Sequence, residues 1–188
     1  MAPPISAISN LSLSSLEGAS RPSATLGLRS QHRPTTPQKS IVEVSPGWKI
    51  YVEESGNPKG IPAVFFHGGP GIRFRQEDHQ WFDPDKYRII VFQQRGTWEC
   101  EPSATNFAIP SKTFESTTIA TLGEDIETLR KHLGIEKWLV FGGSWGSLLS
   151  VFYGQQYPEA CLGLVVRGIF LGTPEENALF LDPKRHAY

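Results

Sequence analysis

The chain has 188 residues, of which 39% are hydrophobic and 20% charged, and its formal net charge is −1 at pH 7. This composition is ordinary for a soluble globular chain, and no apolar run is long enough to cross a bilayer, so we expect no membrane partner. Beyond residue 40 the balance is 14 basic to 18 acidic residues without a basic cluster, which excludes nucleic acid as a partner. The oligomeric state stays open.

Residues 1–40 differ from the rest because they are rich in Ser, Pro, Thr and Ala and show no sustained periodicity. We expect this segment to be a disordered leader. Its basic residues stand against a lone acid, Glu17, and a Ser-rich, Arg-bearing, acid-poor segment is also typical of organelle transit peptides. We expect a cytoplasmic protein, with a mitochondrial or plastid location as the alternative if the segment is a transit peptide.

The two cysteines, Cys100 and Cys161, lack CxxC spacing and a second pair. Their pattern is that of reduced thiols rather than of a metal site or a disulfide scaffold. We expect neither a metal ion nor a cofactor.

From residue 41 onward, strand and helix patterns alternate. Thr117–Leu133 predicts a helix with apolar residues at steps of three and four, ended by Gly134. A second helix is expected between Leu148 and Tyr157-Pro158. Strands are expected at Ile41–Val44 and Lys49–Glu53 as a hairpin, then at Ala63–Phe66, Tyr87–Phe92, Lys137–Phe141 and from Leu162 to Phe170. Successive βαβ units predict an α/β fold with a mainly parallel sheet.

The most informative segment is Gly142–Ser147, where an apolar strand enters Gly-x-Ser-x-Gly and a helical pattern follows. This arrangement is typical of a nucleophile elbow, which raises a serine hydroxyl at a sharp turn from strand to helix. The turn is so tight that Gly142 and Gly146 must lack side chains where chain segments cross. Ser144 is therefore the candidate nucleophile; the alternative is a small-residue turn without catalysis.

A second motif, His67–Gly71, follows the strand at Ala63–Phe66. A glycine-rich turn lets backbone N–H groups approach a developing oxyanion, so we expect the oxyanion hole to consist of the N–H groups of Gly69 and Trp145. His67 is not expected to be the catalytic base, because the histidine of elbow enzymes follows the nucleophile in the chain. We expect it to be a structural, hydrogen-bonded imidazole.

These motifs resemble the proline iminopeptidase family of α/β-hydrolases, and the resemblance extends from about Ile41 to about Gly172. It rests on His67–Gly71, Gln94–Gly96, Asp125–Ile135, Gly142–Ser147 continuing to Tyr157–Glu159, and Leu164–Phe170. It implies an α/β-hydrolase fold, mainly parallel, that stops before the cap and the C-terminal triad residues. The expected organisation is a leader at 1–40, the N-terminal part of the hydrolase domain at 41–172 and the start of a cap region at 173–188.

The resemblance also implies a serine aminopeptidase that releases an N-terminal proline from peptides through an acyl-enzyme intermediate. The family's triad Asp and His lie beyond this chain, so only Ser144, Gly69 and Trp145 carry over, and we expect the chain to be inactive alone. His186 is the single histidine after the elbow, and no complete βα unit precedes it there. The alternatives are an esterase or lipase of the same fold and a non-catalytic, truncated hydrolase domain.

One segment, Gln93–Cys100, departs from the family pattern Asp-Gln-Arg-Gly-x-Gly-x-Ser. Trp98 stands at the second glycine, and a tryptophan does not adopt positive φ cheaply, so we expect this loop to differ if that glycine served its backbone. Arg95 is expected to tie loops together rather than to bind substrate.

Overall fold

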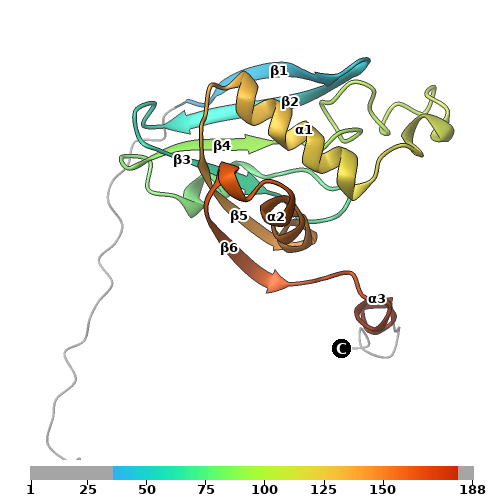
Figure 1. Cartoon of the computed structure of the whole chain (residues 1–188). Helices are drawn as coiled ribbons and strands as arrows, with labels where there is room; N and C mark the ends of the chain where they lie inside the picture. Colours follow the sequence, from blue (N-terminus) through green and yellow to red (C-terminus); the bar gives the residue numbers. More distant parts are fainter. Residues whose placement is uncertain (1–35, 182–188) are drawn as a thin grey trace, which may run out of the picture. The chain divides into compact units, whose positions relative to one another are not determined.

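The computed structural model describes residues 36–181, with the side chains of residues 36–179 (Figure 1). Residues 1–35 of the expected leader, which include His32, and His186 lie outside this range. The expected disorder was wrong for residues 38–40, because they form the start of the first strand, where they pair with the second. The strands are β1 (Gln38–Ser45), β2 (Trp48–Gly56), β3 (Ile61–Phe66), β4 (Tyr87–Phe92), β5 (Trp138–Ser144) and β6 (Cys161–Ile169). The helices are α1 (Ile119–His132), α2 (Trp145–Gln156) and α3 (Pro174–Leu181), with short 3₁₀ turns η1 (Gln76–Trp81), η2 (Ser111–Phe114) and η3 (Pro158–Ala160).

The six strands form one sheet in the order β1-β2-β4-β3-β5-β6. β1, β2 and β4 pair antiparallel, whereas β3 pairs in parallel with both β4 and β5, and β5 in parallel with β6. The expected α/β class is therefore confirmed, with an antiparallel hairpin at one edge of the sheet. The order reverses direction at β3, because β4 lies on one side of it and β5 on the other.

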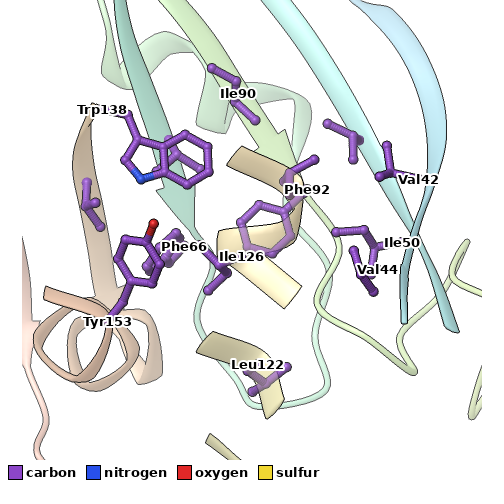
Figure 2. Packing of buried hydrophobic residues seen from close by; sticks show 14 of the residues in the cluster. Val42, Val44, Ile50, Phe66, Ile90, Phe92, Leu122, Ile126, Trp138 and Tyr153 are labelled. Atoms are coloured by element: carbon purple, nitrogen blue, oxygen red, sulfur yellow. The ribbon is translucent and has the colours of Figure 1, made fainter. Parts of the chain in front are cut away.

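Helices α1 and α2 cover one face of the sheet (Figure 1). Leu122, Ile126 and Leu129 of α1 are buried there, which confirms the face expected from their spacing. Figure 2 shows this core, in which aromatic rings meet edge to face. The ring centroid of Phe66 lies 5.8 Å from those of both Phe92 and Tyr153. Each such side chain contributes about 1.5–3 kcal/mol by leaving water, so this face supplies much of the stability of the sheet.

The opposite face carries a smaller core of seven buried residues, to which Phe74 and Phe82 contribute from the segment around η1. Phe141 of β5 is its centre, with Phe65, Trp81 and Phe82 packed against it edge to face. Both faces of β3 and β4 are therefore covered, as the nearly continuous apolar runs of these strands require.

The expected elements agree with the structure to within a few residues. β4 has the expected bounds, while β1 begins at Gln38, three residues before the expected start. Thr118 caps α1 by accepting a hydrogen bond from the Thr121 N–H, and Gly134 follows the helix with φ +64°, the left-handed conformation expected of a residue that ends a helix. α3 lies in the segment expected to begin a cap region; that assignment stays a prediction. Within residues 36–181 no helix has the length and apolar character needed to span a membrane.

Candidate active site

The candidate site lies at the carboxyl ends of β3, β4 and β5, where the strand order reverses. Phe65 of β3 is opposite Val91 of β4, and Phe66 is opposite Gly142 of β5, so the segments that follow these three strands gather at the same edge. Open α/β sheets bind ligands at this place. The elbow, the glycine-rich loop and the segment Gln93–Cys100 all belong to it.

Ser144 occupies the turn between β5 and α2 with φ 56° and ψ −124°, a conformation that non-glycine residues rarely adopt. A Cβ atom on Gly142 would overlap with the carbonyl oxygen of Gly146, and one on Gly146 would overlap with the carbonyl oxygen of Phe66. The expectation that both glycines must lack side chains is therefore confirmed. Backbone strain of this kind is typical of functional sites, and here two glycines allow it.

Trp145 is the first residue of α2, and the structure gives α2 no side-chain cap. The first N–H groups of a helix lack intrahelical acceptors, and they lie at the positive end of the helix dipole. Two serines brace the turn from inside: Ser147 donates to the Ser144 carbonyl oxygen at 2.6 Å, and Ser150 donates to that of Gly146 at 2.7 Å. The N-terminus of α2 thus presents backbone donors next to Ser144.

The loop His67–Gly71 lies directly against the elbow. A Cβ atom on Gly68 would lie 3.7 Å from the Cβ of Ser144 and 3.5 Å from the Gly143 carbonyl oxygen. Gly69 has φ +125°, and a Cβ there would come within 2.9 Å of the Gly71 nitrogen. The structure therefore brings Ser144, Gly69 and Trp145 together at one edge of the sheet, as the sequence predicts; their catalytic roles remain predictions.

His67 is buried and both of its ring nitrogens are engaged. Nε2 lies 3.2 Å from the Gln94 backbone N–H, which can only donate, and Nδ1 lies 2.8 Å from the Gly68 carbonyl oxygen, which can only accept. The imidazole must therefore be neutral, with its proton on Nδ1. Burial lowers its pKa to about 4. The expected structural imidazole is confirmed, because its one lone pair is already occupied.

Neither of the two other described histidines lies where it could act as the base for Ser144. His79 donates through Nε2 to the Glu53 carboxylate at 3.0 Å and shares a hydrogen bond of 2.7 Å with the Ser55 hydroxyl through Nδ1, in a polar cluster on η1 and β2. His132 ends α1, which returns the chain to the start of β5, at the opposite end of that strand from Ser144. Within the described residues, therefore, no histidine is positioned to accept the proton of Ser144.

Gln94 joins the loop to the elbow, a role that the sequence analysis missed. Its side-chain Nε2 donates to the His67 carbonyl oxygen at 2.9 Å, and its Oε1 accepts from the Trp145 indole N–H at 2.9 Å. The only signal in the sequence was its place in the stretch Gln94–Gly96 that carries the family resemblance.

Arg95 is buried and has the structural role expected of it. It donates through two nitrogens to the carboxylate of Asp125 on α1, and to the Ser45 hydroxyl at 3.1 Å. Its guanidinium also lies over the Trp48 ring at 4.6 Å. Arg95 thus fixes the segment after β4 to α1 and to the β1–β2 hairpin, and its side chain is only 5% exposed.

Trp98 adopts φ 40°, a left-handed conformation that costs a tryptophan more than a glycine. The expected difference between this loop and the family pattern stays a prediction. A chain of contacts holds it: Arg73 lies over the Trp98 ring at 5.3 Å, Glu99 pairs with Arg73 at 3.1 Å, and Gln93 donates to Glu99 at 3.0 Å. Side-chain contacts to neighbouring segments therefore override the backbone preference of this residue.

Glu101 and the two cysteines are structural. Glu101, which is exposed to solvent, pairs with Lys49 at 2.9 Å. Cys100 and Cys161 are free, and burial raises the pKa of the Cys100 thiol to about 11, so this thiol is a poor nucleophile. Among residues 36–179 no group of three or more His, Cys, Asp and Glu side chains is arranged to hold a metal ion.

Comparison with known proteins agrees with this geometry. Residues 62–186 match the family model described as the alpha/beta hydrolase fold. The chain is 49% identical over 137 residues to a proline iminopeptidase of Neisseria gonorrhoeae. The matched segment makes up 73% of this chain and 42% of that protein. It is 45% identical over 155 residues to a proline iminopeptidase of Arabidopsis thaliana, which covers 82% of this chain and 39% of that protein.

Solved structures show the same fold. A proline iminopeptidase-related protein of Thermus thermophilus matches with a TM-score of 0.58 at 21% identity, covering 70% of this chain and 44% of that one. Epoxide hydrolase A of Mycobacterium thermoresistibile matches with a TM-score of 0.57 at 24% identity, covering 70% and 39%. This chain spans about two fifths of the length of the curated relatives that it matches.

Proposed function

Because the chain belongs to the alpha/beta hydrolase fold family, we propose that it supplies the nucleophile and the oxyanion hole of a prolyl aminopeptidase. The substrate would be a peptide with an N-terminal proline, the residue named by the relatives at 49% and 45% identity. The proposal rests on the position of Ser144, which has φ 56° at the turn between β5 and α2 and lies beside the loop His67–Gly71.

The reaction would begin with attack of the Ser144 hydroxyl oxygen on the carbonyl carbon of the proline. Negative charge then develops on the carbonyl oxygen, and the N–H groups of Gly69 and Trp145 would stabilise it, helped by the positive end of α2. The peptide bond breaks as the leaving amine takes a proton, and water hydrolyses the acyl-enzyme to release proline.

The proton of Ser144 needs an acceptor, and His67 is excluded because its lone pair is already engaged. The family resemblance implies a histidine and an aspartate from the part of the hydrolase fold that the relatives have in addition to the matched segment. Without a base, a serine hydroxyl is a weak nucleophile at neutral pH, and loss of triad members costs on the order of 10⁴-fold or more in rate. Residues 1–188 alone should therefore hydrolyse very slowly.

The same geometry suits esters, so the acyl preference is what distinguishes an aminopeptidase from an esterase or lipase. The experiment compares hydrolysis of proline p-nitroanilide with that of an acetyl ester by the protein as its source makes it, and by its Ser144→Ala variant. Hydrolysis of the anilide that Ser144→Ala abolishes, and that Ser111→Ala on the exposed η2 turn leaves intact, supports the proposal. Ester hydrolysis alone would favour the esterase, and full activity of Ser144→Ala would reject the nucleophile.

A cytoplasmic location is likewise proposed, and it is supported by the two free thiols, Cys100 and Cys161. The alternative is a mitochondrial or plastid location directed by residues 1–40. Fractionation of the source cells tests it, and a mature protein that begins near residue 40 inside an organelle would reject the cytoplasmic proposal.

A further inference from the structure

Gln94 makes a bridge between the two segments that carry the proposed oxyanion donors. One donor, Gly69, belongs to the loop that starts at His67, and the other, Trp145, starts α2. The Gln94 side chain contacts both segments: Nε2 donates to the His67 carbonyl oxygen at 2.9 Å and Oε1 accepts from the Trp145 indole at 2.9 Å. One buried amide is thus bonded to both segments.

The orientation of this amide is determined by its partners. A carbonyl oxygen can only accept and an indole N–H can only donate, so the NH₂ group must face His67 and the oxygen must face Trp145. A third bond comes from the backbone, where the Gln94 N–H donates to Nε2 of His67 at 3.2 Å. Each contact of Gln94 with His67 and Trp145 is therefore matched in donor and acceptor character.

The backbone of Gln94 is itself held firmly. Its carbonyl oxygen accepts from the N–H of Thr97 at 3.1 Å, from the hydroxyl of Thr97 at 2.7 Å and from the Cys100 thiol at 3.4 Å. The next residue, Arg95, anchors the segment to α1 through Asp125. The bridge therefore starts from a rigid base, and Gln94 is only 3% exposed.

We propose that Gln94 is a positioning residue, which sets the separation of the Gly69 and Trp145 N–H groups and so the geometry of the oxyanion hole. It touches no reacting atom in this arrangement; it acts through His67 and Trp145. An oxyanion donor stabilises the transition state only when it lies about 2.7–3.1 Å from the developing charge, so a small displacement of either segment lowers kcat. This inference rests on the proposed function.

The test uses the protein as its source makes it, assayed with proline p-nitroanilide. Trp145→Phe removes the indole N–H but keeps the backbone N–H, and Gln94→Met keeps the length of the side chain but removes both of its hydrogen bonds. Both variants should lower kcat by roughly 10- to 100-fold with little change in KM, because they weaken an interaction made in the transition state. The double variant should lose no more than Gln94→Met, since both changes break the same bridge.

Trp138→Phe is the matched control. Trp138 is buried at the other end of β5, and its indole N–H makes none of the hydrogen bonds that join the loop to the elbow, so its removal should leave kcat unchanged. Equal losses in Trp138→Phe and Trp145→Phe, or a rise in KM at constant kcat, would overturn the inference.

A second measurement does not depend on activity. Amide hydrogen exchange followed by mass spectrometry should become faster in peptides that cover His67–Gly71 and Ser144–Ser147 in Trp145→Phe and Gln94→Met, and not in Trp138→Phe. Unchanged exchange in Trp145→Phe would overturn the bridge whatever the kinetics, even if Gln94→Met failed to fold. A wild-type protein that does not cleave the anilide would reject the proposed function alone, and the exchange measurement would still decide on the bridge.

Discussion

Individual residues at this site combine unusual backbone conformations with buried polar side chains. Ser144 and Trp98 are the non-glycine residues with positive φ in the described part of the chain. Two glycines make room around Ser144, whereas contacts with Arg73 and the neighbouring Glu99 hold Trp98 in place. The strained backbone is therefore made possible by neighbouring glycines at Ser144 and by side-chain contacts at Trp98. Each of these two causes can be tested separately.

The strain at Trp98 predicts a difference between two small replacements. Trp98→Ala loses the ring and keeps a Cβ at φ 40°, while Trp98→Gly loses the ring and accepts this conformation freely. Trp98→Gly should therefore be more stable than Trp98→Ala by about 1 kcal/mol, although glycine is elsewhere the less stable choice. Urea unfolding of both variants measures this, and a glycine variant less stable than the alanine variant would refute the assigned strain.

The neutral His67 predicts a loss of stability in mild acid. Its pKa is lowered from 6.5 to about 4 in the folded state, so below pH 6.5 the unfolded chain binds a proton that the folded chain refuses. The free energy of unfolding should fall by roughly 2 kcal/mol between pH 6.5 and about pH 5. Above pH 6.5 His67 is neutral in both states, so it causes no such loss there. Urea unfolding at both pH values should show the loss in the wild type and a smaller loss in His67→Gln; equal losses would contradict it.

Arg95 joins three elements that lie around the site. Its guanidinium connects the segment after β4 with α1 through Asp125 and with the β1–β2 hairpin through Ser45 and Trp48. The apolar face of α1 also packs on the sheet, so the position of this helix does not depend on the ion pair. The Arg95–Asp125 pair therefore attaches the segment after β4 to a helix that is already fixed.

Removing one partner of the Arg95–Asp125 pair should lower the stability of the protein more than replacing both partners by apolar residues. Arg95→Met leaves the Asp125 carboxylate buried without its partner, for an expected loss of about 3–5 kcal/mol, whereas Arg95→Met combined with Asp125→Leu removes both charges and should recover much of the loss. Thermal unfolding of the single and double variants measures the difference. A double variant no more stable than Arg95→Met would show that the pair itself is not what stabilises the junction.

The elements could be predicted from the sequence to a greater degree than their contacts. Period-two and period-3.6 patterns are local, and they predicted β4 with its observed bounds and α1 to within two residues. The elbow was predictable because its glycines are required by close backbone contacts at fixed spacing. Gln94 and Trp98 were not, because their roles depend on partners from distant segments, such as Trp145 and Arg73, that no local pattern reveals.

At the scale of the whole molecule, the sheet is covered unevenly. β3 and β4 are buried on both faces, whereas β6 pairs with β5 alone in the described chain and exposes Leu162, Val165 and Ile169. Parallel strands are normally covered on both faces, and an apolar edge strand invites pairing with another chain. The exposed apolar side chains of β6 therefore favour self-association at this edge of the sheet.

This edge predicts self-association of the 188-residue chain produced by itself. Val165 is 44% exposed and Ile169 is 66% exposed, so Val165→Lys and Ile169→Lys place charges on the edge without removing buried contacts. Light scattering after size-exclusion chromatography should show smaller particles for these variants than for the wild type. Ile41→Lys on β1, an exposed apolar residue at the opposite edge of the sheet, is the control, and an equal effect there would contradict the role of β6.

We propose that Ser144 is the nucleophile of a prolyl aminopeptidase. The most direct measurement is the intact mass and peptide map of the protein from its source after reaction with a fluorophosphonate, made alongside the rate of proline p-nitroanilide hydrolysis. We expect one adduct per chain, on the peptide that contains Ser144, formed in step with the loss of hydrolysis. An adduct on another residue, or hydrolysis that persists after Ser144 is fully modified, would contradict it.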